Sequence, residues 1–270
     1  MRPKYTHTIN TFEDYCVEKG DVEFAAYIKD IESMMNLQDY MLAAYRAMAY
    51  LDGVESEEYM LMSVAIITKN LDYIYNALEL NRKGQYAAAR VIFRNVYESL
   101  IILKTVALTK NEKLLSSWIE GEEINLRREI FSQITHPKSE EMKRLWNDLC
   151  RFCHGTVFSC QALFDYDKAK HDIEYNYIVI MMLLYMNYHV LNRYVFSENM
   201  KAQADRMIFI EGEESIKEKR KILRDMFRER KQALRKEPRK VLTDFSKVWK
   251  FKEYSSREVK EKQGNIKVHS

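Results

Sequence analysis

Residues that interrupt helices are scarce in this sequence. Only 7 glycines and 3 prolines occur among 270 residues, and no proline lies between Pro3 and Pro137. Proline kinks a helix because it lacks a backbone donor, whereas β-rich folds need many turns built from glycine and proline. The scarcity of both residues excludes a β-rich fold and predicts an all-α protein.

Cysteines are few, and their spacing does not resemble a secreted disulfide framework. The first five residues, Met-Arg-Pro-Lys-Tyr, lack the apolar core of a secretory signal. These two features predict a cytoplasmic protein with reduced thiols. The four cysteines are Cys16, Cys150, Cys153 and Cys160.

Two cofactor interpretations involve the segment 150–160. Its start, Cys-Arg-Phe-Cys-His, matches the attachment string of c-type haem, and with Cys160 it could supply four zinc ligands. Zinc-binding pairs usually lie on tight turns, whereas this stretch has the pattern of a helix. We therefore expect neither a metal nor a cofactor.

Long hydrophobic runs are also rare, and the best membrane candidate is residues 175–196. The run is long enough to span a bilayer, but polar and basic residues interrupt it. Such groups are costly in lipid, so the pattern predicts a buried core helix and no membrane association. The interrupting residues are Asn176, Asn187, His189, Asn192 and Arg193.

Charge is distributed unevenly, although the formal net charge is only +3. Residues 215–270 contain 19 Lys and Arg against 8 Asp and Glu, a net of +11, which leaves −8 on the rest of the chain. A split of this kind indicates a binding partner more than a fold. We expect three regions: N-terminal helices (1–55), a helical bundle (56–212) and a basic C-terminal extension (213–270).

Apolar residues recur with helical spacing through most of the chain. Gly53 and Gly84 mark the ends of two helices. The helix that follows Gly84 is apolar on nearly every side, which predicts a central position in a bundle. The expected helices are 21–51, 56–83, 85–109, 111–134, 139–154 and 172–198, with one more exposed helix in the basic extension.

The predicted central helix also carries charge. Arg90, Arg94 and Glu98 recur every four residues and therefore form one stripe. Buried charges must be paired, and Arg94 with Glu98 is an available pair. Two interpretations stay open: a structural ion pair that locks the bundle, or an anion-binding or catalytic site.

A second candidate region surrounds His154, three residues after Arg151 and so on the same helix face. Histidine changes charge near neutral pH and suits proton transfer. A histidine on a mostly apolar helix can equally be a hydrogen-bonded core residue.

Residues 84–98, followed by an apolar run, resemble the central helix of the HEPN-like family, in which an arginine and a glutamate face inward. Residues 149–159 are similar to a later helix of that family, where a histidine precedes a small residue. The resemblance covers about residues 60–200. It implies an antiparallel all-α bundle, a homodimer, RNA or nucleotide ligands and, in active members, metal-independent RNA cleavage in phage defence or toxin systems. The spacing of Arg151 and His154 is shorter than in the family's nucleases.

The first functional hypothesis is therefore an RNA-directed protein with ribonuclease activity. His154 would act as general acid and base, Arg90 and Arg94 would hold the phosphate, Glu98 would orient the arginines, and Arg151 would lie beside the histidine. The alternative is a non-catalytic helical dimer whose basic arm recruits a protein or nucleic acid. Basic residues can neutralise phosphates and aromatic ones can stack on bases. The candidate nucleic-acid-binding residues are Lys217, Lys221, Arg224, Arg228, Arg230, Lys231, Arg235 and Trp249.

Overall fold

The computed structural model describes residues 4–51, 58–122, 124–132, 139–153 and 166–195, together with Lys221 and Asp225. Within these ranges the chain is helical and contains no strand, which confirms the predicted all-α class. The elements are α1 (Lys4–Glu23), α2 (Ala25–Leu51), α3 (Glu58–Arg82), α4 (Tyr86–Thr109), α5 (Glu112–Ile119), the π-helical η1 (Leu126–Phe131), α6 (Ser139–Cys153), α8 (Tyr166–Val190) and the π-helical η2 (Leu191–Val195).

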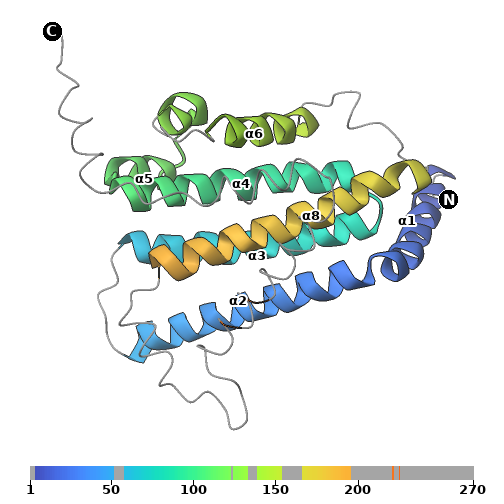
Figure 1. Ribbon diagram of the computed structural model, residues 1–270, viewed down its shortest axis with the longest axis horizontal. Coiled ribbons are helices and arrows are strands. Elements are labelled where there is room, and N and C mark those ends of the chain that lie inside the picture. Colours follow the sequence, from blue (N-terminus) through green and yellow to red (C-terminus); the bar gives the residue numbers. More distant parts are fainter. Residues whose placement is uncertain are drawn as a thin grey trace.

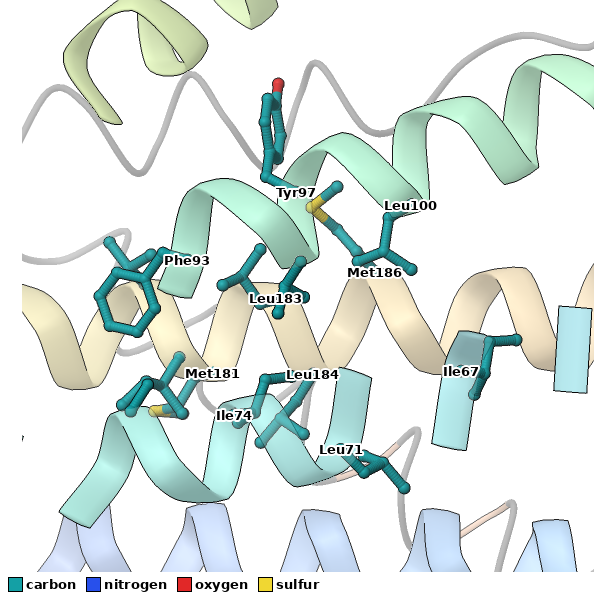
Figure 2. Close-up of a cluster of buried hydrophobic side chains, with 14 of the residues drawn as sticks. Ile67, Leu71, Ile74, Phe93, Tyr97, Leu100, Met181, Leu183, Leu184 and Met186 are labelled. Carbon is teal, nitrogen blue, oxygen red and sulfur yellow. The ribbon is translucent and has the colours of Figure 1, made fainter. Parts of the chain in front are cut away.

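Helix α4 lies at the centre of the bundle, as its all-round apolar pattern predicts. It packs against α3, α8 and α6, while α2 covers the far side of α3 and α8 (Figure 1). Side chains from α3, α4 and α8 meet in a dry cluster that includes Ile74, Phe93 and Leu183, all with 0% exposure (Figure 2). Each large apolar side chain buried in this way contributes about 2 kcal/mol relative to its exposed state.

Most predicted boundaries agree with the structure to within about two residues, which is the usual uncertainty of helix ends. They include the two ends of α4, the end of α3 and the starts of α5 and α6. The first boundary was wrong, because Asp21 lies in the last turn of α1 rather than at the beginning of a helix. The α8 helix also begins earlier than predicted, at Tyr166.

The predicted helix 111–134 is divided in two. It begins as expected, because the Asn111 side chain accepts a hydrogen bond from the backbone N–H of Leu114 at 3.1 Å. It ends at Ile119, and Gly121 then adopts a left-handed φ of 82°. A glycine in this conformation ends a helix, so η1 forms a separate turn.

The connection between α3 and α4 requires its glycine. Gly84 has a φ of 75°, and a Cβ atom there would lie 2.7 Å from the Cys16 Sγ of α1. Helix α1 is held at this turn by Arg82, whose guanidinium donates to both carboxylate oxygens of Asp21 at 2.9 and 2.7 Å. The pair raises the pKa of Arg82. Helix α1, predicted from the sequence only as part of an N-terminal region, thus contacts the turn that precedes the central helix.

Candidate functional site

Arg90 is buried in the structure, with 6% of the residue exposed. Its Nε donates to the Asn176 side-chain oxygen at 2.8 Å, and its Nη2 lies 2.6 Å from a carboxylate oxygen of Asp172. The rings of Tyr175 and Tyr86 lie 5.2 and 5.6 Å from its guanidinium carbon. The guanidinium is therefore enclosed by α4 and α8 and neutralised by a carboxylate from α8.

Asn176 connects this ion pair to the rest of the bundle. Its amide nitrogen donates to the Asn81 side-chain oxygen and to the Tyr86 carbonyl, both at 2.9 Å. Asn81 in turn donates to the Ile173 carbonyl at 3.0 Å. Asn81 and Asn176 both have 0% exposure, so unmet hydrogen bonds here would be costly. The network joins the end of α3, the start of α4 and α8.

Arg94 lies one turn later and forms the pair predicted from the sequence. Its Nε donates to Glu98 Oε1 at 2.8 Å, and the two side chains are 29% and 21% exposed. The same Glu98 oxygen accepts a hydrogen bond at 2.6 Å from the indole nitrogen of Trp146 on α6. Arg94 and Glu98 therefore lie on the partly exposed edge between α4 and α6, whereas Arg90 faces α8.

The structure describes only some of the other predicted site residues. Arg151 lies in the last turn of α6, and His154, which follows that helix, is outside the described residues. Of the candidate nucleic-acid-binding residues in the basic extension, the structure describes Lys221, which is helical and exposed. The structure thus brings Arg94 and Glu98 together. Arg90 has other partners, on α8. The role of His154 stays a prediction.

A second buried cation lies further along α4. Lys104 is 4% exposed, and burial together with the nearby Arg193 guanidinium lowers its pKa to about 7. Burial, Lys104 and Arg193 also lower the pKa of His189 on α8 to about 4. Basic groups from α4, α8 and η2 therefore lie within electrostatic range of one another at this end of the bundle.

The sequence contained a signal for this second cluster. His189 and Arg193 are two of the polar residues that interrupt the apolar run 175–196, and their spacing of four places them on one helix face. Lys104 interrupts the apolar run of α4 in the same way. From the sequence alone this pattern argues only against a membrane span, because the proximity of Arg193 to Lys104 depends on the tertiary fold.

Among the helices that the structure describes, none combines the length and the apolar character needed to cross a membrane. Within the same ranges, no group of three or more His, Cys, Asp or Glu side chains is arranged to hold a metal ion. Comparisons of the chain with protein-family models, with curated proteins and with solved structures found no match.

Proposed function

We propose that this chain is a HEPN-like helical protein directed at RNA, with the edge between α4 and α6 as its ligand-contacting region. The observation that supports this most is the geometry of Arg94. Its guanidinium is partly exposed and is oriented by Glu98, which Trp146 holds from α6. An oriented, partly wet arginine is suited to bind a phosphate oxygen.

The position of α6 supports the inclusion of His154 in this region. Tyr97 and Glu98 contact Met142 and Trp146, whereas the carboxylate of Asp148 acts electrostatically on Tyr175, whose ring lies over Arg90. In this proposal the two helices run antiparallel, and the chain leaves α6 beside Arg90 and Arg94.

The proposal assigns different roles to the two arginines. Arg94 contacts the phosphate, Glu98 orients Arg94, and His154 transfers protons if cleavage occurs. Arg90 has a structural role, because Asn176 and Asp172 hold its guanidinium inside the bundle. This role replaces the phosphate contact that the sequence suggested for Arg90.

Cleavage is tested by incubating the purified protein with end-labelled RNA in the presence of EDTA. We expect His154→Ala to abolish product formation and His171→Ala, which removes an exposed histidine of α8, to leave it unchanged. Equal cleavage by all three proteins, or by none of them, would remove the catalytic form of the proposal.

Binding is tested separately by titrating labelled RNA with Arg94→Met and with Arg144→Met. Arg144 is an exposed arginine of α6, so the control removes the same charge at a nearby position. We expect about tenfold weaker binding for Arg94→Met and less than about twofold for the control, since a charge-assisted phosphate contact is lost only in the first. Equal RNA affinities of Arg94→Met and Arg144→Met would contradict the proposal that RNA contacts the α4–α6 edge.

A second candidate function is a non-catalytic interaction module whose basic arm binds a protein or nucleic acid. The enclosure of Arg90 by Asp172 and Asn176 favours it, because that part of the charged stripe is committed to the fold. Deletion of residues 213–270 separates the two functions. Loss of RNA binding in the deletion, with no effect of Arg94→Met, would favour the module. Loss of RNA binding in Arg94→Met, with no effect of the deletion, would favour the α4–α6 edge as the ligand-contacting region.

A further inference from the structure

Helix α1 is attached to the bundle differently from α2, the helix that follows it. In the part of α1 whose side chains the structure describes, the buried residues are the small Cys16 and Gly20, and Phe12 is half-buried. Helix α2 instead buries a row of large apolar side chains, including Ile31 and Met41 with 0% and 1% exposure. Because packing of large apolar side chains supplies most of the stability of a helix in a bundle, α1 gains less from packing than α2.

Charged and polar contacts hold α1 across the end of the bundle (Figure 1). The Asp21 carboxylate accepts two hydrogen bonds from Arg82 of α3, at 2.9 and 2.7 Å. The Glu23 carboxylate accepts one from Lys170 Nζ of α8 at 2.8 Å and one from the Tyr166 hydroxyl at 2.9 Å. Both ion pairs are partly exposed, since the Arg82 and Lys170 side chains are 25% and 42% accessible. Pairs of this kind are individually weak and are weakened further by salt.

A third carboxylate of α1, that of Glu13, contacts the turn between α3 and α4. It accepts a hydrogen bond from the Gln85 side chain and lies 3.9 Å from Lys83 Nζ. Cys16 lies against Gly84 in the middle of the same turn, where a Cβ atom would come within 2.7 Å of the sulfur. One face of α1 therefore covers this turn, and the first turn of α4 follows directly after it.

The chain changes direction between α1 and α2 (Figure 1). Helix α1 ends at Glu23, α2 begins at Ala25, and Phe24 between them lies in a turn. Phe24 is 4% exposed, and its ring lies 5.1 Å from the ring of Tyr177 on α8. Tyr27 of α2 stacks on the same Tyr177 ring at 6.0 Å. Helix α2 is thus anchored on α8 up to this turn by contacts that do not involve α1.

We propose that α1 is a strap that opens and closes as a unit over the turn between α3 and α4, with Phe24 as its pivot. In the closed state the carboxylates of Asp21, Glu23 and Glu13 hold the strap, and salt favours opening because it screens them. Opening requires less free energy than unfolding of the bundle, since it exposes few large apolar side chains.

Opening of the strap also affects the surroundings of Arg90. Arg82, which α1 holds, directly follows Asn81 in the chain, and Asn81 accepts a hydrogen bond from Asn176. Asn176 in turn binds Arg90 and the Tyr86 carbonyl at the start of α4. We therefore expect the first turn of α4 to loosen when α1 leaves.

Cys16 reports the open state, because it is 0% exposed while α1 is docked. Burial and the Glu13 carboxylate raise the pKa of its thiol to about 11, so the docked thiol keeps its proton and reacts poorly. Iodoacetamide is a neutral reagent that reacts slowly, so its rate follows the population of the open state. The full-length chain is used with its other cysteines changed to serine, namely Cys150, Cys153 and Cys160.

In this single-thiol chain we expect Arg82→Met to raise the rate about tenfold, since two charge-assisted hydrogen bonds to Asp21 are lost. Lys170→Met should raise it about threefold, because one more exposed pair is lost. The controls Arg128→Met and Lys29→Met remove the same charges at exposed positions of η1 and α2, and they should change the rate less than about twofold. Sodium chloride should also raise the rate of the single-thiol chain.

Hydrogen exchange measured by mass spectrometry locates the opening. Lys170→Met changes a surface side chain, so it keeps the test valid if Arg82→Met fails to fold. Either variant should exchange faster in α1 and in the first turn of α4, with α2 and α6 unchanged. Equal rates of Cys16 modification in both variants and both controls would overturn the proposal. Equal acceleration of exchange in all helices would also overturn it, because Cys16 would then react through global unfolding.

Discussion

The two ends of α4 each bury a basic side chain, but they surround it differently. Arg90 is 6% exposed, and Asp172 and Asn176 hold its guanidinium. Lys104 is 4% exposed, and the charged groups that shift its pKa and that of His189 are basic. The first arrangement is a neutralised structural network, whereas at the second end burial and the nearby Arg193 guanidinium disfavour the charged form of Lys104.

The difference shows which buried charge belongs to the fold. A buried ion pair with satisfied hydrogen bonds fixes the relative position of two helices, and removal of one partner leaves the other uncompensated. A buried charge that its surroundings disfavour, as burial and Arg193 disfavour that of Lys104, instead lowers stability. At the Arg90 end we therefore expect mutations to destabilise the protein, and at the Lys104 end we expect loss of charge to stabilise it.

The largest effect is expected from Asn176→Leu. This change removes the hydrogen bonds to Arg90, Asn81 and the Tyr86 carbonyl, all in a buried network. Each unmet buried group costs about 1–3 kcal/mol, so the free energy of unfolding should fall by about 3 kcal/mol or more. Urea denaturation measures the change, with Asn76→Leu at an exposed position of α3 as the control. A loss below about 1 kcal/mol would contradict the structural role of this network.

Lys104→Met should act in the opposite direction. Because the folded-state pKa of about 7 lies below the ordinary 10.5, the unfolded chain binds the proton more tightly. The cost of Lys104 is therefore complete below about pH 7 and disappears as pH rises toward about 10.5. At neutral pH the variant should be more stable by a few kcal/mol, on the order of the shift.

The pH dependence distinguishes this effect from simple repacking. Between about pH 7.5 and about pH 10 the wild-type chain should gain stability relative to Lys104→Met by up to about 1.4 kcal/mol per pH unit. Urea denaturation at several pH values measures the difference. Parallel stability curves for the two proteins would mean that Lys104 carries no unusual charge cost.

A smaller effect is expected at the edge between the two ends, from Trp146→Phe. An aromatic ring beside Phe131 is retained, whose centroid lies 6.0 Å from that of Trp146, while the indole hydrogen bond to Glu98 is lost. One charge-assisted hydrogen bond of this kind contributes about 1 kcal/mol. Trp118→Phe on α5 is the matched control, and a double-mutant cycle with Glu98→Gln isolates the coupling. A coupling free energy near zero would contradict the claim that Trp146 of α6 orients Glu98.

The smallest effect is expected from Arg94→Lys. The Arg94–Glu98 pair is partly exposed and lies four residues apart on one helix, so it contributes about 0.5 kcal/mol or less. Thermal denaturation at low and at high salt should show a difference from the wild type that shrinks as salt is added. A large loss of thermal stability that does not depend on salt would instead indicate that Arg94, like Arg90, holds the helices of the bundle together.

The sequence predicted those features of α4 that depend on local spacing. Its boundaries follow from Gly84 and the apolar run, and the Arg94–Glu98 pair follows from a spacing of four residues. The surroundings of Arg90 and Lys104 could not be predicted, because α8 and η2 supply them from about 80 to 90 residues later in the chain. Asn176 and His189 were visible as interruptions of an apolar run, but only the fold shows which charges they meet.

The most direct test of the difference between the two ends is the pKa of Lys104 itself. In a nitrogen-15 NMR titration of lysine-labelled protein, one lysine should titrate near pH 7, and this signal should be absent from Lys104→Met. Titration of every lysine near its ordinary value of about 10.4 would contradict the account, because Lys104 would then carry its charge at no cost.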